Sequence, residues 1–147
     1  MSNQIVTTMP ADDRDAFLGT GGTGVLSLST GDDSPPHAVP VSYGYDATES
    51  TFYLRLAVGP DSEKGDLAAR PATLVIDDVG DDVVRSVVAR GQLESVEESA
   101  IGTDALEGLG RVHIPLYDVF ELPTEEMPFE FYRLDPVELT SRRAATE

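Results

Sequence analysis

The residues best suited to chemistry surround the single lysine of the chain, Lys64. An apolar segment (residues 52–58) ends in a Gly-Pro turn, and a short helix is expected over residues 61–70 with Ser62 and Lys64 in its first turn. Free backbone N–H groups at the start of a helix favour a phosphate group. Arg55, in the preceding strand, could add a planar donor. This spacing indicates an anion site.

The same residues also permit a purely structural interpretation. Asp61 or Ser62 can cap the helix, and Lys64 can be a solvated surface charge. The chain has 27 acidic and 10 basic residues, so one retained ammonium group calls for a reason. The residue pattern alone leaves both interpretations open.

Other combinations of reactive residues are weak. The two histidines, His37 and His113, lack the spacing of a metal site. His37 begins a predicted strand and could contact a ligand, although a surface histidine is the commoner case. No serine lies in a nucleophile-elbow pattern, and the acidic pair at residues 77–78 is typical of a solvated turn. These patterns do not favour a hydrolase.

The elements that must position these residues are mostly strands. Alternating apolar and polar residues predict strands over residues 25–29, 38–45, 51–58, 72–77, 83–96 and 129–140. Pro40 indicates an edge, a bulge or a backbone that faces something other than a strand, and Gly91 indicates a bend. Short turns between strands favour a mainly β fold, an antiparallel barrel in one domain over residues 1–147.

Two helices flank the predicted barrel. The first is expected over residues 8–18, with Thr8 as its cap, Pro10 in its first turn and acidic residues at its positive end. The second, over residues 99–109, has a weaker pattern. The glycine-rich run at residues 19–24 precedes a strand, which is the wrong order for a dinucleotide loop, and is expected to be a flexible connection. Residues 141–147 are expected to be a tail.

Composition limits the classes of partner. A formal net charge of −17 disfavours binding to nucleic acid and to anionic membranes, because such binding depends on clustered cations. The chain lacks cysteine, so disulfides and thiol chemistry are excluded. It also lacks a long apolar run and the pattern of a signal peptide, which leads us to expect a cytoplasmic protein. Strong acidity with arginine replacing lysine is typical of a halophilic, high-salt cytoplasm; an ordinary acidic protein is the alternative.

Four segments resemble the pyridoxamine 5′-phosphate oxidase superfamily of flavin-binding split barrels. They are Phe52-Tyr53 followed by Ser62-x-Lys64-Gly65-x-Leu67 and Pro71, the Val39–Asp46 strand, the Val87–Glu94 strand, and the closing Phe131–Pro136 segment. They cover most of the chain in the order found in the family. The resemblance implies a six-stranded antiparallel split β-barrel with flanking helices, and together with the acidic composition it leads us to expect a haloarchaeal-type member of the family.

The resemblance also implies a cofactor and a set of contacts. The cofactor would be FMN, bound between the subunits of a homodimer that acts as a small oxidoreductase on a small-molecule substrate. By resemblance, Lys64, Ser62 and Arg55 hold the phosphate, and Tyr53 lies beneath the ring or the ribityl chain. The strand formed by Val39, Pro40, Val41 and Ser42 runs beside the isoalloxazine, and Ser86 contributes from the partner subunit. In such a site the flavin does the redox work and the protein binds and orients it.

Departures from the family pattern keep other functions open. Val39, Gly44 and Glu63 occupy places where the better-known oxidases carry cations. Pyridoxamine-phosphate oxidation is therefore not expected. The alternatives are a deazaflavin-dependent reductase on the same barrel and a non-enzymatic dimeric protein that binds flavin or haem.

Overall fold

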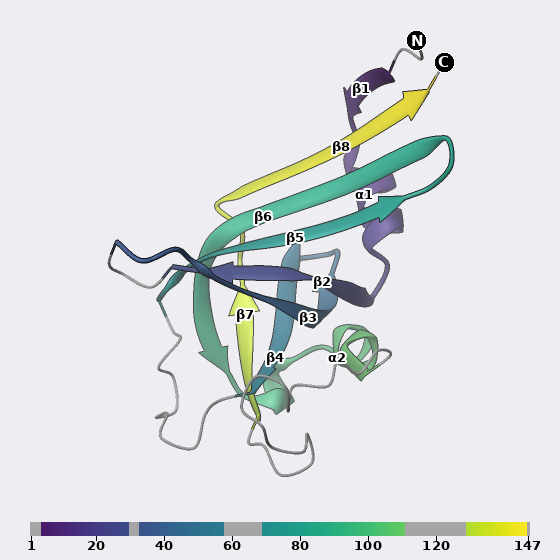
Figure 1. Cartoon of the computed structure of the whole chain (residues 1–147). Helices are drawn as coiled ribbons and strands as arrows, with labels where there is room; N and C mark the ends of the chain where they lie inside the picture. Colours follow the sequence, from purple (N-terminus) through teal and green to yellow (C-terminus); the bar gives the residue numbers. More distant parts are fainter. Residues whose placement is uncertain (1–3, 30–32, 58–68, 111–128, 147) are drawn as a thin grey trace.

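The computed structural model describes residues 4–29, 33–57, 69–110 and 129–146. Eight strands and two α-helices form this part of the chain (Figure 1). The strands are β1 (Gln4–Thr8), β2 (Gly21–Leu28), β3 (His37–Asp46), β4 (Thr51–Ala57), β5 (Pro71–Val79), β6 (Val83–Val96), β7 (Phe129–Leu134) and β8 (Glu138–Thr146). The helices are α1 (Ala11–Leu18) and α2 (Thr103–Gly110), and a 3₁₀ turn covers Glu98–Ala100. No helix in the described ranges is long and apolar enough to cross a membrane.

Six of the strands close into an antiparallel barrel. Their order is β6-β5-β2-β3-β4-β7, and β7 pairs again with β6. The predicted mainly β fold, a six-stranded antiparallel barrel with flanking helices, is confirmed. Strands β8 and β1 continue the sheet beyond the barrel, so that both ends of the chain lie on this extension (Figure 1).

Strand β6 belongs to both the barrel and the extension. Its first part, Val83 to Arg90, pairs with β8, and its last part, Leu93 to Val96, pairs with β7. The change of partner occurs at Gly91, where an added Cβ would lie 2.8 Å from the carbonyl oxygen of Asp135. The predicted bend at Gly91 therefore has a steric cause.

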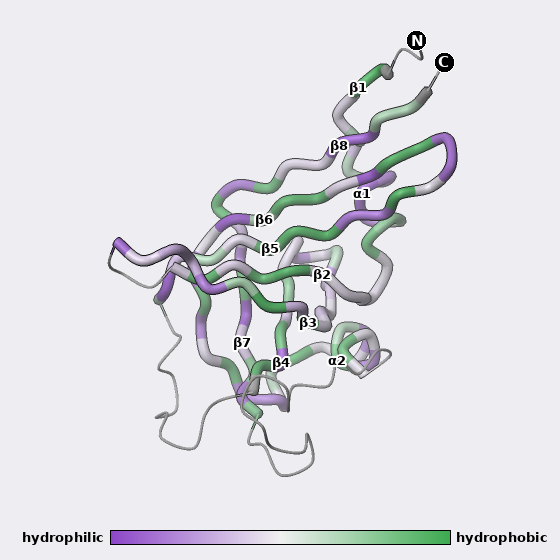
Figure 2. Tube along the Cα trace, viewed as in Figure 1, coloured by the Kyte–Doolittle hydropathy of each residue, from purple (hydrophilic) through white to green (hydrophobic). Residues whose placement is uncertain are grey.

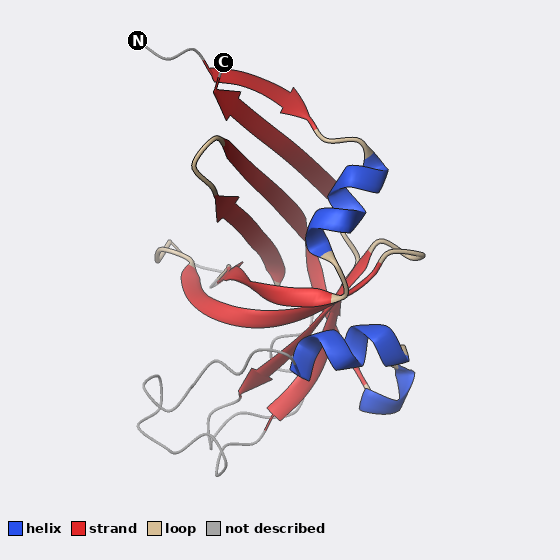
Figure 3. Cartoon of the chain, turned by 90° about the vertical axis from the view of Figure 1, so that its right-hand side faces the viewer, coloured by secondary structure: helices blue, strands red, loops and turns tan. Residues whose placement is uncertain are grey.

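The core lies inside the barrel, where alternate residues of each strand meet. Its largest fully buried side chains include Tyr45, Phe52 and Tyr132. Helix α1 covers one side of this core: the Tyr43 hydroxyl donates to the Leu18 carbonyl (3.0 Å), and the Tyr45 hydroxyl donates to the Asp15 carboxylate (2.7 Å). Figure 3 shows α1 on one side of the extension, and the opposite side of β8, β6 and β5 carries no described helix.

Two predictions near the N-terminus were wrong. Residues 21–24 are not a flexible connection but the first half of β2, paired with residues 41–44 of β3. The first helix begins at Ala11, because residues 4–8 form β1 and pair with β8. Thr8 ends that strand, and Pro10 occupies the cap position without a side-chain bond.

The C-terminal prediction was also wrong in part. The strand expected over residues 129–140 is interrupted after Leu134 and resumes at Glu138 as β8, which extends through the expected tail. Pairing on both sides explains the difference, since β8 lies between β1 and β6. Strand formation there depends on neighbours that a local pattern does not reveal.

Candidate functional site

The candidate site begins at an open edge of β3. Strand β2 pairs with His37 to Gly44 along one side of β3, whereas β4 pairs only with Tyr43 to Asp46 on the other side. No described strand therefore pairs with residues 37–42 on that second side. Of the three alternatives that Pro40 indicated, the described strands fit an open edge, because a residue without an N–H group is tolerated where the ladder is open.

Alternation along β3 divides the four predicted contact residues into two pairs. Val41 belongs to the core and Val39 packs against it, so both face inward. Pro40 and Ser42 face outward; Pro40 is exposed, whereas Ser42 is buried. The main chain of all four residues follows the open edge, but only Pro40 and Ser42 present side chains to the outer face.

Tyr53 lies on the outer face of β4, directly opposite Gly44. It packs in a small apolar cluster with Ile101, Ala105 and Leu109, and only 7% of its surface is exposed. Burial, with the nearby Asp46 carboxylate, raises the pKa of the Tyr53 phenol. Tyr53 is thus a fixed neutral side chain beneath α2.

Helix α2 packs directly against β2 and β3, and glycines allow the close contact. A Cβ on Gly44 would lie 2.1 Å from the carbonyl oxygen of Ala105, and one on Gly108 would lie 1.9 Å from that of Thr20. Gly21 has a similar contact with Gly108. The helix backbone therefore touches the strand backbones, and α2 walls one end of the outer face beside Ser42. The sequence signals for this contact are the glycines themselves, of which only Gly21 belongs to the run at residues 19–24.

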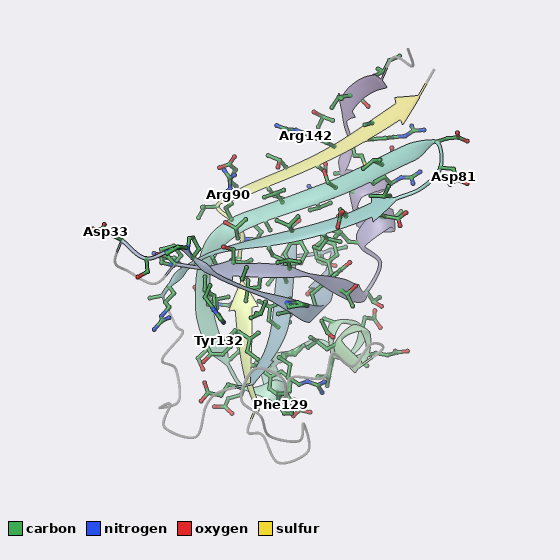
Figure 4. All side chains as sticks on the ribbon, viewed as in Figure 1. Asp33, Asp81, Arg90, Phe129, Tyr132 and Arg142 are labelled. Carbon is green, nitrogen blue, oxygen red and sulfur yellow. The ribbon has the colours of Figure 1, made fainter. Side chains whose placement is uncertain are left out.

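Arg55 also faces outward from β4, two residues beyond Tyr53. Its guanidinium lies 4.9 Å from the centroid of the Phe129 ring, a cation–π contact, and the side chain is half-buried. Figure 4 marks Phe129 at the start of β7. The resemblance singled out Arg55 but not Phe129, which holds that guanidinium at the edge of the barrel.

The structure does not bring every predicted residue to one place. Ser86 lies on β6, three strands from β3 in the sheet order, which corresponds to about 14 Å at the usual strand spacing. Ser62 and Lys64, together with the helix expected over residues 61–70, lie outside the described residues. His37 begins β3 and is exposed. Within the described ranges no group of acidic or histidine residues could hold a metal ion.

The outer face of β3 and its neighbouring strands therefore combines an open backbone edge on β3, an apolar surface on β3, β2 and β5, and the Arg55 cation on β4. Pro40, Val25 and Val75 lie side by side across three strands and supply the apolar surface. Such an arrangement can hold a flat ring with a polar rim, because the ring can lie on the apolar side chains and its rim can meet main-chain groups.

Comparison with solved structures supports this fold. An FAD-binding protein from Mesorhizobium loti is 22% identical, with a TM-score of 0.67, and the match covers 97% of this chain and 99% of that one. A putative pyridoxamine 5′-phosphate oxidase from Corynebacterium glutamicum is 20% identical, with a TM-score of 0.64 and coverage of 100% and 98%. An FAD and haem binding protein from Mycobacterium smegmatis is 18% identical, with a TM-score of 0.62 and coverage of 97% and 73%.

The sequence comparisons identify the family. A search of curated proteins gives no match. The family model described as pyridoxamine 5′-phosphate oxidase, however, matches residues 10–143, a span that runs from the start of α1 into β8. The chain therefore belongs to the pyridoxamine 5′-phosphate oxidase family.

Proposed function

We propose that this chain is an FMN-binding flavoprotein, a small oxidoreductase that works as a homodimer with its flavin between the two subunits. Family membership supports the flavin, and two of the structural neighbours above are named for binding FAD. The observation that carries the proposal is the open edge of β3 beside an apolar outer face.

The described residues fit an isoalloxazine ring. Its pyrimidine rim needs hydrogen-bonding groups, and the main chain of Val39 to Ser42 lies along the open edge. Because the side chains of Val39 and Val41 face inward, these two residues would contribute through their backbone. Pro40 would lie against the ring, and α2 would close the end of the site beside Ser42.

The phosphate would be held by cations. Arg55 is the described candidate, and by resemblance Ser62 and Lys64 would join it. Tyr53 would support the site from beside α2, and the partner subunit's Ser86 would complete it. When bound, the flavin supplies electron transfer with a small-molecule substrate, while these residues bind and orient it. The acidic composition supports a place in a high-salt cytoplasm.

The first test is an absorbance spectrum of the protein purified in high salt, followed by titration with FMN, FAD and haem. We expect the bands of an oxidised flavin, about one flavin per subunit, and a preference for FMN. A protein that stays colourless and binds none of the three would contradict the proposal. Preference for FAD would keep the flavin site and correct the cofactor.

A substitution tests the phosphate contact. We expect Lys64→Ala to weaken FMN binding by about 1.5–3 kcal/mol, the range of a charge-assisted hydrogen bond. Arg143→Gln is a matched control, since it removes one positive charge from β8, outside the β3–β4 region. Equal FMN affinity in the wild type and Lys64→Ala would remove Lys64 from the site.

A second candidate is a non-enzymatic flavin or haem carrier. The similarity to the mycobacterial FAD and haem binding protein favours it. Reduction of the bound flavin by NAD(P)H and rapid reoxidation would support the oxidoreductase. Tight binding without turnover would support the carrier.

A further inference from the structure

Strand β1 forms one outer edge of the sheet. It stands first in the strand order, it pairs with β8 on one side, and no other described strand pairs with its second side. Figure 1 shows β1 beyond β8, at the end of the extension away from the barrel. An unpaired edge can accept a further strand, because its backbone N–H and C=O groups are free to bond.

The register of β1 shows which of its backbone groups point to the open edge. The pairing with β8 continues to Met9, which lies opposite Ser141 and donates its N–H to the Ser141 carbonyl (3.0 Å). In an antiparallel pair, residues that bond to the partner strand alternate with residues whose N–H and C=O groups point away from it. Counting back from Met9, the odd-numbered residues of β1 bond to β8. Val6 and Thr8 therefore direct their N–H and C=O groups to the open edge.

The sequence of β1 lacks the features that usually protect an edge strand. Charged side chains and proline at an edge discourage the addition of another strand. The strand, QIVTT, has neither, and Ile5 (50% exposed) and Val6 (62%) expose apolar side chains on opposite faces. Figure 2 shows this hydrophobic start of β1 beside a hydrophilic stretch of β8. The open edge of β3 differs, since Pro40 interrupts its N–H groups. Strand β1 is thus the edge better suited to strand addition.

Two arginines of β8 lie next to this edge strand, one on each face of the sheet. Arg142 lies opposite Thr8, and Arg143 lies opposite Thr7. Both arginines are exposed, and neither has an ion-pair partner among the described residues. Figure 4 marks Arg142 on β8. In a chain with 27 acidic and 10 basic residues, two adjacent unpaired guanidiniums beside an uncharged strand favour acidic groups from outside the described chain.

An extended acidic segment fits both features of this edge. On a strand paired with β1, the residues opposite Thr7 and Thr8 would lie two strand spacings, roughly 10 Å, from the backbone of β8. Threonine is small, so a glutamate on the added strand and an arginine on β8 can meet across it. The two acids must be consecutive, because Thr7 and Thr8 face opposite sides of the sheet. A second copy of β1 would not supply them, since β1 is uncharged.

We propose that the open edge of β1 binds an extended segment of another protein as an additional antiparallel strand, and that this segment carries two consecutive acidic residues that pair with Arg142 and Arg143. The backbone groups of Val6 and Thr8 supply affinity, and the two arginines supply selectivity. The site is separate from the proposed flavin site. Strand β1 lies five places from β3 in the strand order, and the added strand would lie about 14 Å from β6, which carries Ser86.

Binding of a peptide tests the backbone edge. The probe is a fluorescently labelled peptide with blocked ends, two glutamates followed by alternating valine and threonine, and fluorescence anisotropy measures its binding to the full chain with its flavin. We expect Val6→Pro to weaken binding about tenfold, because it removes an N–H from the open edge and leaves the bonds to β8 in place. Val6→Thr is the matched control: it keeps the N–H, so we expect a smaller change, about threefold at most. Circular dichroism establishes that both variants are folded.

A second peptide, with two lysines in place of the glutamates, tests the charge selectivity. The net charge of −17 favours the lysine peptide, so a preference for glutamate must come from charges near the edge, which act over about 8 Å at 0.15 M salt. We expect the glutamate peptide to bind about fivefold more tightly, and the double variant Arg142→Gln/Arg143→Gln to reverse the preference. Arg85→Gln is the control, since Arg85 lies opposite Arg143 but one strand farther from the edge. In about 1 M salt the preference should disappear, and the effect of Val6→Pro should remain.

Three outcomes would overturn the inference: no binding of either peptide, equal effects of Val6→Pro and Val6→Thr, or tighter binding of the lysine peptide by the wild type. Self-association of the wild type that Val6→Pro abolishes would also overturn it, because the edge would then belong to a second copy of the chain. Flavin absorbance of each sample is measured separately. A protein that binds flavin but neither peptide would refute this site and leave the proposed function standing.

Discussion

The outer surface of the sheet has two regions that differ in what covers them. Helix α2 packs on one region, whereas no described element covers the other. In the region covered by α2, one row joins Gly21, Gly44, Tyr53 and Arg133 across β2, β3, β4 and β7. The outer side of the sheet extension, which we call the bare face, carries a row of aliphatic residues across β1, β8, β6 and β5: Val6, Ala144, Val84 and Val79. The covered row contains glycines because a helix lies on it. The bare row contains three valines, whose branched side chains a covering surface could bury.

The two regions show two ways in which the face of a sheet can be shielded from water. Where the chain supplies its own cover, the contact is made at backbone distance, and the strands lose their side chains at that point. On the bare face no described element provides cover, and the apolar side chains stay partly exposed. Glycine on an outer strand face thus predicts a cover from the same chain, and exposed valine favours a cover from another.

The largest effect is expected where α2 contacts β3. We expect Gly44→Ala to lower the free energy of unfolding by about 3 kcal/mol, because the new Cβ would lie 2.1 Å from the Ala105 carbonyl oxygen and α2 must shift. Urea unfolding measures the change. Gly102→Ala is the control: nothing lies within 4 Å of its Cβ position, and we expect less than about 0.5 kcal/mol. Similar values for the two variants would contradict the close contact.

A second test measures whether water reaches Tyr43 in the core beside α1. Burial raises the pKa of Tyr43 to about 12, against 10 in an unfolded chain. Stability that depends on its neutral phenol is fully present below pH 10 and is lost as the pH rises through about 12. The loss is up to about 2.7 kcal/mol for a shift of two units.

In Tyr43→Phe the free energy of unfolding should fall less steeply as the pH rises. The variant also loses the hydrogen bond to Leu18, which costs about 1 kcal/mol at every pH. Some slope should persist, because burial raises the pKa of Tyr45 and Tyr53 in the same direction. Urea unfolding between pH 8 and 11 measures the slope, and equal slopes in both proteins would show that Tyr43 is hydrated.

Much of the fold could be predicted from local sequence. Strands β3 to β6 have strong apolar alternation, Gly91 indicated the bend, and Pro40 indicated the open edge. Strands β1 and β8 and the start of β2 could not be recognised, because their sequences are polar or glycine-rich and they form strands through their pairing partners. Local patterns carry little information about such pairing.

The candidate site was predictable only as a set of segments. The resemblance selected β3, Tyr53 and Arg55, which do lie on adjoining strands. It could not show that Val39 and Val41 face inward or that Phe129 holds Arg55, since these facts depend on register. Ser86 shows the same limit: its neighbours Asp77 and Arg142 come from distant segments and became visible only through the ladders.

The smallest expected effect concerns one exposed side chain of the bare face. We expect Val79→Ser to weaken dimerisation by about 1 kcal/mol, roughly fivefold, since part of an apolar side chain in each copy no longer becomes buried. Val137→Ser is the matched control: Val137 is even more exposed, at 89%, but lies in the turn between β7 and β8, outside the bare face. Because both side chains are exposed in the monomer, neither change should alter its unfolding much. Sedimentation equilibrium distinguishes the two variants. If both variants weaken the dimer equally, general surface apolarity rather than the bare face stabilises it. Exposed valines on a sheet face would then not indicate that a second chain covers that face.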